Sequence, residues 1–312
     1  MSVMTTVPTA AARRPGHHHK PGAVTRRPGM GALFVAPLAV VVAVLFLVPL
    51  GVLIFMSFQK WPLLGSPTAN GLKNYTSIPD NALFMGAITF TLLYTLITTV
   101  IIFAVSFVLV AISNSGRRGS RFYRTAFFLP YVVGVASASL IWYGMVNDQT
   151  GIANRVLESL GITDGPFGFL DTPGKALATT VSLVVWKFIG FQVIVLLIGL
   201  QAVPGELYEA AHLDGASTWQ RLRYITVPHL RPTLALLLIL SVTGSLLAFD
   251  QFMVLTKGGP DNSTVTMVIA VYQTAFSQFS LGKAAALSVL LLVALVALNG
   301  VQLLVLRRRD ER

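Results

Sequence analysis

Residues 203–232 read VPGELYEAAHLDGASTWQRLRYITVPHLRP and form the longest polar interruption in the C-terminal half of a very apolar chain. Pro204 suits the first position of a helix, where its missing N–H would be unpaired in any case. Glu206 then places a negative charge in the first turn, near the positive end of the helix dipole. Gly215 suits the left-handed position that ends many helices. The stretch therefore predicts a short helix from Pro204 to Asp214.

A second short helix is predicted directly after the first. Ser217 and Gln220 have the S-x-x-Q spacing of a capping box, in which the two residues pair with free N–H groups at a helix start. Pro228 disfavours the helical conformation in Val227, the residue before it, so we expect the second helix to end there. The whole stretch is thus predicted to be two short helices joined by a bend.

The same stretch resembles the "EAA" loop of binding-protein-dependent ATP-binding-cassette (ABC) importer permeases, E-A-A-x-x-D-G-A followed by I-x-L-P. The matching residues are Glu209, Ala210, Ala211, Asp214, Gly215, Ala216, Ile225 and Pro228. The chain departs mildly, with Leu222 where an aromatic residue is common and Val227 in place of Leu. In that family the loop is a cytoplasmic coupling element that docks in a cleft of an ATPase subunit, so the resemblance implies this role here. The alternative is an ordinary amphipathic helix on the membrane surface.

The composition is that of a membrane protein. Of 312 residues, 54% are hydrophobic and only 11% are charged, whereas a soluble domain has about 25% charged residues. The net charge of +11 is explained below by basic residues retained on one side of a membrane, so it does not require a nucleic-acid partner. The chain has no cysteine, which excludes disulfides and thiolate chemistry.

Six long apolar stretches predict an all-α bundle of six transmembrane helices. Each approaches or exceeds the ~20 residues that cross the hydrocarbon core as a helix. The predicted spans are about residues 32–58, 83–112, 125–146, 176–200, 233–255 and 284–306, between a polar and disordered N-terminal tail (1–31) and a short C-terminal tail (307–312). The apolar segment 263–279 carries several Thr, Ser and Gln residues, and we interpret it as an interfacial or re-entrant helix that does not cross.

The basic residues predict the orientation. With segment 263–279 not crossing, 16 of the 23 Lys and Arg residues fall on the side of both termini, of the loop after span two and of the 203–232 loop. Six fall on the opposite side, and Lys187 lies within a span. Because Lys and Arg are retained in cytoplasmic loops, both termini and the 203–232 loop are predicted to be cytoplasmic, in a multi-pass protein of the inner (cytoplasmic) membrane.

No residues in the sequence indicate a catalytic function. The chain lacks G-x-x-x-x-G-K-[ST], H-E-x-x-H and G-x-S-x-G, and it has no cluster of metal-ligating residues. We therefore assign no catalytic residue, no metal site and no cofactor to this chain. If transport is driven by ATP, the ATP is used by a partner ATPase.

Two further resemblances narrow the class to carbohydrate-uptake permeases of the maltose and glycerol-3-phosphate type, in particular the first permease of each system. The stretch Thr256-Lys257-Gly258-Gly259-Pro260, then Thr264, Tyr272 and Ala275-Phe276, is similar to their T-x-G-G-P…T…Y…A-F pattern. Residues 71–75, GLKNY, resemble their G-L-x-N-Y. The resemblance implies a type I importer permease fold, a sugar or oligosaccharide substrate, a second homologous permease, an ATPase dimer and an extracytoplasmic solute-binding protein.

Two other functions stay open at this point. An ion-coupled secondary transporter would place ionisable residues and broken helices at mid-membrane, where only Lys187 and Asp250 qualify. An ABC permease for a non-sugar solute such as glycerol-3-phosphate is the other.

The candidate substrate path comprises Phe249, Asp250, Gln251, Tyr272 and Gln273, because carboxylate and amide groups beside aromatic rings suit sugar hydroxyls and ring faces. Asp250 could instead pair with Lys257 or contact the partner permease.

Overall fold

The computed structural model describes residues 28–113 and 120–310, and it is almost entirely helical. Predictions on residues 1–27, 114–119 and 311–312, which include much of the basic tail and loop, lie outside the described residues. The chain divides into two units, Met1–Leu50 and Gly51–Arg312. The first contains α1 (Pro28–Val42), the π-helical turn η1 (Ala43–Leu47) and the start of α2 (Val48–Ser57).

The second unit starts with the rest of α2, which is followed by a small hairpin and then by further helices. Strands β1 (Gln59–Lys60) and β2 (Thr68–Ala69) pair antiparallel, with Gln59 opposite Ala69. The helices that follow are α3 (Lys73–Thr76), α4 (Ala82–Ser113), α5 (Ser120–Val132), α6 (Val135–Val146), α7 (Ile152–Ser159), α8 (Pro173–Gln201), α9 (Gly205–Leu213), α10 (Thr218–Arg221), η2 (Leu222–Thr226), α11 (Val227–Leu246), α12 (Asp250–Leu255), α13 (Met267–Tyr272), η3 (Gln273–Ser277) and α14 (Leu281–Asp310).

Within the described residues, five helical stretches are long and apolar enough to cross a membrane, and the bent pair α5–α6 makes a sixth if it is counted as one span. The five are Val35–Ser57, Ala82–Ile112, Pro173–Gln201, Thr218–Leu255 and Leu281–Val305. The all-α, multi-span prediction is therefore confirmed.

Two predicted spans are not continuous helices. Within 125–146, α5 and α6 meet at an angle of 106°, because Gly134 adopts an extended conformation (φ −58°, ψ 148°) and starts α6 as its N-cap. Within 233–255, α11 ends at Leu246 and α12 begins at Asp250 after a short non-helical link. Hydropathy could not locate these breaks, since each is only two or three residues long (133–134 and 247–249) and does not interrupt the apolar character of a whole span.

Segment 263–279 is a short embedded helix. Its helical part, Met267–Ser277, falls well below the ~20 residues of a spanning helix. Thr266 caps it by accepting a hydrogen bond from Ile269 N (3.2 Å) while its hydroxyl donates to Ala248 O (2.7 Å). Met267 and Ile269 are buried, and the helix packs on α4 and α14. This arrangement agrees with the expectation that the segment does not cross the membrane.

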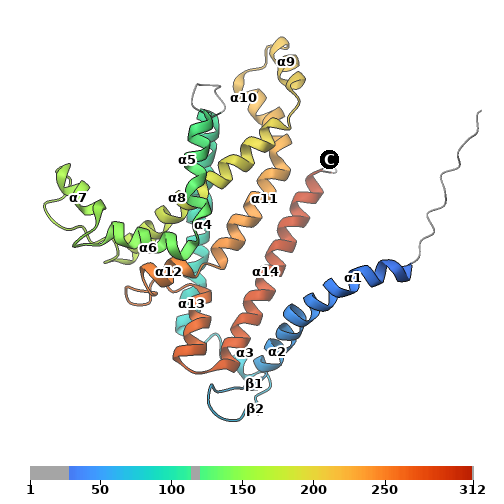
Figure 1. Ribbon diagram of the computed structural model, residues 1–312, viewed down its shortest axis with the longest axis vertical. Coiled ribbons are helices and arrows are strands. Elements are labelled where there is room, and N and C mark those ends of the chain that lie inside the picture. The colour runs from blue at the N-terminus through green and yellow to red at the C-terminus, as the bar shows by residue number, and fades with distance from the viewer. Residues whose placement is uncertain (1–27, 114–119, 311–312) are drawn as a thin grey trace, which may run out of the picture. The chain divides into compact units, whose positions relative to one another are not determined.

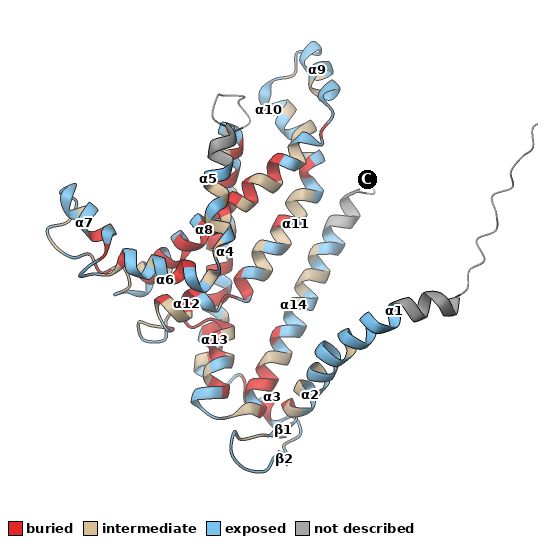
Figure 2. Cartoon of the chain, viewed as in Figure 1, coloured by how far each residue is buried: buried red, intermediate tan, exposed pale blue. Residues whose placement is uncertain are grey.

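The core of the second unit lies where α4, α8, α11, α12 and α13 meet. Tyr94, Phe252 and Ile269 are fully buried in it, and the ring of Phe252 packs edge-on against that of Tyr94 at 4.9 Å. Buried residues gather in α8, α13 and the lower part of α14, whereas α9 and α10 are almost entirely exposed (Figure 2). Figure 1 places α9 and α10 at one end of this unit, the end toward which the C-terminal part of α14 points, with α3, the hairpin and α13 at the other.

Candidate functional site

The first of two candidate sites is the exposed turn formed by α9 and α10. Pro204 is the N-cap of α9 and not its first helical residue, so the helix starts one residue later than predicted. The end of α9 is as expected: Gly215 has φ +72°, and its N–H donates to His212 O (3.1 Å). The next N–H, of Ala216, donates to Ala211 O (2.9 Å). This pair of bonds is a Schellman motif, which fixes the direction in which the chain leaves α9.

The second helix begins with the predicted capping box. Ser217 N donates to Gln220 Oε1 (2.7 Å), and Gln220 N donates to Ser217 Oγ (3.3 Å). The predicted end at Val227 is wrong, because Val227 is helical (φ −62°, ψ −43°) and the chain runs from α10 through η2 into α11. The wider π turn of η2 precedes Pro228, which sits in the first turn of α11 where its missing N–H costs least. The second helix of the turn and the spanning helix α11 are therefore one helical unit.

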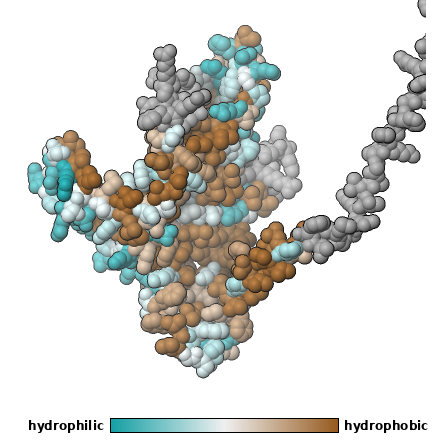
Figure 3. Space-filling model, viewed as in Figure 1, coloured by the Kyte–Doolittle hydropathy of each residue, from teal (hydrophilic) through white to brown (hydrophobic). Residues whose placement is uncertain are grey.

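A hydrogen bond joins the two helical segments of the turn, and most of the surface of the turn is exposed. Tyr208 Oη and Thr226 Oγ1 lie 2.9 Å apart and hydrogen bond, which joins α9 to η2. Large apolar side chains stand out among the polar ones, with Leu213 at 88%, Trp219 at 65% and Tyr224 at 70% exposure. Of the motif residues, Ala211, Ala216, Ile225 and Pro228 are half-buried, and Glu209, Ala210, Asp214 and Gly215 are exposed. The polar colouring of this end in Figure 3 contrasts with the apolar middle of the helices.

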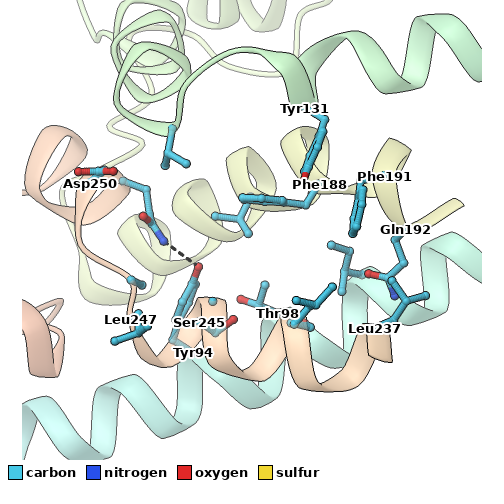
Figure 4. Close-up of a pocket in the computed structure, with 18 of the residues that line it drawn as sticks. Tyr94, Thr98, Tyr131, Phe188, Phe191, Gln192, Leu237, Ser245, Leu247 and Asp250 are labelled. Carbon is cyan, nitrogen blue, oxygen red and sulfur yellow. Dashed lines mark hydrogen bonds between the residues drawn. The ribbon is translucent and has the colours of Figure 1, made fainter. Parts of the chain in front are cut away.

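The second candidate site is a cavity of about 380 Å³ in the second unit. Its walls come from α4, the α5–α6 bend, α8, α11 and the link that leads into α12 (Figure 4). The lining side chains are Tyr94, Thr98, Ile102, Tyr131, Val135, Val184, Phe188, Phe191, Gln192, Leu237, Leu240, Ser241, Ser245, Leu247, Ala248, Phe249, Asp250 and Gln251, with the backbone of Gly244. Its volume is in the range of pockets for small molecules.

The structure brings together three of the five predicted path residues. Phe249, Asp250 and Gln251 all line the cavity, at the start of α12. Tyr272 does not line it, although its ring packs on that of Phe249 with centroids 5.6 Å apart. Gln273 does not line it either. Asp250 is exposed, whereas Gln251 is 6% exposed and donates through Nε2 to Tyr94 Oη (3.2 Å).

Further polar groups line the cavity that the sequence analysis did not single out. Gln192 of α8 is 3% exposed, and its Nε2 has no hydrogen-bond partner among the described residues. Figure 4 shows Gln192 at the opposite end of the cavity from Asp250. Ser241 also lines the wall and hydrogen bonds with Thr99 of α4 (3.2 Å). Polar side chains within otherwise apolar spans are the signal that could have found Gln192 and Tyr94.

Aromatic rings form one wall of the cavity. Tyr131 stacks on Phe191 with centroids 4.7 Å apart and an interplanar angle of 12°. Phe188 meets the same tyrosine edge-on at 6.0 Å. Rings beside hydroxyl and amide groups suit a ligand that has both apolar faces and hydrogen-bonding groups.

The two stretches that resemble carbohydrate permeases have structural roles. Buried Asn74 donates through Nδ2 to Ser57 O and Gln59 O, at 2.8 Å each, and so fixes the end of α2 to the hairpin. Buried Thr264 donates to Gly259 O (2.6 Å), and its Oγ1 also lies 2.7 Å from that of Thr256. A Cβ on Gly258 would lie 2.8 Å from Val265 Cγ2, so a side chain there would not fit. Each stretch therefore closes a tight loop.

Known proteins resemble this chain over most of its length. Residues 108–311 match the family described as binding-protein-dependent transport system inner membrane component. The arabinooligosaccharides transport system permease protein AraP of Bacillus subtilis is 32% identical over 274 residues, covering 87% of this chain and 86% of AraP. The sn-glycerol-3-phosphate transport system permease protein UgpA of Agrobacterium fabrum is 31% identical over 281 residues, covering 89% and 94%.

A solved structure shows the same fold. A chain of the bacterial alginate ABC transporter, crystallised in complex with alginate pentasaccharide-bound periplasmic protein, matches with a TM-score of 0.77 and 21% identity, over 88% of this chain and 93% of that one. The fold, the EAA-type turn and the family match agree. The chain is therefore a multi-pass membrane protein that belongs to the family of binding-protein-dependent ABC importer permeases.

Proposed function

We propose that this permease works with a second, homologous permease, an ATPase dimer and an extracytoplasmic solute-binding protein, and that it moves a sugar or oligosaccharide into the cell. The observation that carries the ATPase pairing is the rigid turn of α9 and α10. A Schellman motif ends α9 and a capping box starts α10, and a hydrogen bond joins Tyr208 to Thr226. The turn is also continuous with the spanning helix α11. A push on this turn would therefore move a wall of the cavity, since α11 contributes Leu237, Ser241 and Ser245 to it.

We infer the contacts with the ATPase from the side chains that the turn exposes. Ala210 has a side chain small enough to let another protein surface approach α9 closely, and Glu209 beside it supplies a polar contact. Leu213 and Trp219, both largely exposed, are apolar groups that a partner surface would cover. ATP binds to the partner ATPase and no cofactor binds to this chain.

The orientation in this proposal places the turn and both termini in the cytoplasm. The basic residues support it, because 16 of 23 fall on that side. The arrangement of the second unit supports a common side for the turn and the C-terminus, because α9, α10 and the C-terminal part of α14 lie toward one end and the loops of α3 and α13 toward the other (Figure 1).

The cavity favours a neutral sugar over an anionic solute such as glycerol-3-phosphate. Among the described residues that line it, none is Lys or Arg, and Asp250 contributes a carboxylate. A phosphate group would meet this negative charge without a cation from this chain. Hydroxyl groups can instead bond to Asp250 and Gln192, and sugar ring faces can pack on Tyr131.

An ion-coupled mechanism has less support. Lys187, in the middle of the spanning helix α8, does not line the cavity and donates to backbone carbonyls, Tyr131 O (3.3 Å) among them. It therefore has a structural partner in place of an ion-binding carboxylate.

The test is uptake by Asp250→Asn and Gln251→Ala variants of the reconstituted transporter, with ATPase activity stimulated by the binding protein measured in parallel. Loss of uptake with stimulation retained supports these residues as part of the substrate path. Unchanged uptake in both variants removes them from it. Competition by unlabelled glycerol-3-phosphate, but not by oligosaccharides, would overturn the sugar assignment.

A further inference from the structure

Lys187 is a buried cationic residue that neither the coupling turn nor the cavity lining uses. It lies in the middle of α8 and is 3% exposed. Its Nζ donates hydrogen bonds to Pro130 O (3.4 Å), Tyr131 O (3.3 Å) and Val133 O. All three acceptors belong to the end of α5 and to the break before α6.

These acceptors are carbonyls that the break deprives of helical partners. In a continuous helix each C=O would accept from the N–H four residues further on. The 106° bend at Val133 and Gly134 interrupts that ladder. A backbone carbonyl at membrane depth must find another donor within the protein. A Lys ammonium carries three donors, and its charge is favourable at the negative end of α5.

The same contact reaches the aromatic wall of the cavity. Lys187 Nζ lies 5.8 Å from the ring centroid of Tyr131 and 5.2 Å from that of Phe188. Both rings line the cavity, and Tyr131 stacks on Phe191. The backbone of Tyr131 accepts a hydrogen bond from Lys187 while its ring faces the cavity, so one residue fixes both the bend and the wall.

We propose that Lys187 is a positioning residue for transport: it replaces the missing backbone donors at the α5–α6 bend and thereby holds the aromatic wall in the shape that accepts the substrate. The link to substrate rests on the proposed function, whereas the link to the bend does not. Without the ammonium, these carbonyls lose their donors, and a move of α5 and α6 toward a straighter arrangement, which would restore helical donors, displaces Tyr131.

The experiment compares Lys187→Met with Lys187→Arg in the complete reconstituted transporter. Lys175→Met is the matched control, since Lys175 lies in the first turn of the same helix and is outside the cavity lining. Two readouts are measured: the KM and maximal rate of uptake, and the distance between spin labels on Leu129→Cys and Leu140→Cys, which flank the bend and are 67% and 62% exposed. The chain has no cysteine of its own, so within it only the two introduced residues take a label, and the permease is labelled before it is combined with its partners.

Lys187→Met is expected to raise KM about tenfold, equivalent to about 1.4 kcal/mol, and to shift the label distances to longer and broader values. Lys187→Arg should restore both readouts, and Lys175→Met should leave both unchanged. An unchanged distance distribution in Lys187→Met, or an Arg variant as impaired as the Met variant, overturns the proposal. If Lys187→Met does not assemble, Lys187→Gln supplies a milder comparison, because its amide keeps two donors and loses the charge, so both readouts should change in the same direction as expected for Met but by less. Absence of sugar uptake in the parent protein would refute the proposed function while the distance measurement still tests the bend.

Discussion

Replacing Gly215 tests whether the shape of the α9–α10 turn, and not only its chemistry, couples the permease to an ATPase. Gly215 has φ +72°, and no atom lies within 4 Å of the position a Cβ would take. A side chain there meets no clash within this chain, so its cost is conformational. An L-residue in this region costs roughly 1–2 kcal/mol, and a β-branched residue is disfavoured most. Asn is tolerated there better than other non-glycine residues, so it should cost less.

Three variants therefore form a graded series. Gly215→Val should reduce the fraction of turns in the docking conformation by roughly 5- to 30-fold, the factor that corresponds to 1–2 kcal/mol. Gly215→Ala should lie between, and Gly215→Asn should stay close to the parent. The assay is retention of the ATPase on a tagged permease in mild detergent, with uptake measured in parallel and membrane insertion as the control. Retention by Gly215→Val equal to the parent would refute the reasoning. Equal losses for Asn and Val would also refute it, because they would point to side-chain bulk at an interface and not to backbone conformation.

Three other predictions concern topology, the hairpin and the cavity. A reporter fused after Arg312 should be cytoplasmic and one fused after Asn262 outside; a cytoplasmic signal at Asn262 would contradict the assignment of the last two spans. Asn74→Leu removes the buried amide that bonds to Ser57 O and Gln59 O, at a cost of about 1–3 kcal/mol, and should lower the Tm in detergent, whereas Thr76→Val on the exposed side of α3 should not. Gln192→Leu removes a buried donor without a partner, so it should keep or raise the Tm yet raise the KM of uptake; a lower Tm with unchanged KM would assign Gln192 to the core.

Local signals in the sequence were sufficient for the turn but not for its far end. Gly215 and the Ser217–Gln220 capping box act within a few residues, so their conformations follow from their own chemistry. The end predicted before Pro228 was wrong because the chain continues through the π turn of η2, and this proline occupies the first turn of α11 that follows it. A residue-by-residue rule cannot detect that adjustment.

The apolar spans could also be predicted from the sequence, but their breaks depend on distant residues. Pro130 and the glycines within 125–146 do not single out Val133 and Gly134 as the bend, since the donor that stabilises it comes from Lys187, more than fifty residues later. The cavity has the same property, because Tyr94 and Gln251 hydrogen bond across 157 positions of sequence. The α12 part of the cavity could be predicted from its polar and aromatic residues; polar residues of α4 and α8 stand out in their apolar spans, but that they face the same cavity depends on the packing of the bundle.

The most direct test is uptake of a labelled oligosaccharide into proteoliposomes that contain this permease with its partner permease, ATPase and binding protein. We expect uptake that requires ATP on the side of the α9–α10 turn, requires the binding protein on the other side, and persists when ionophores abolish all ion gradients. Uptake that proceeds without the ATPase and stops when the gradients are abolished would contradict the assignment of this chain as the permease of an ATP-driven importer.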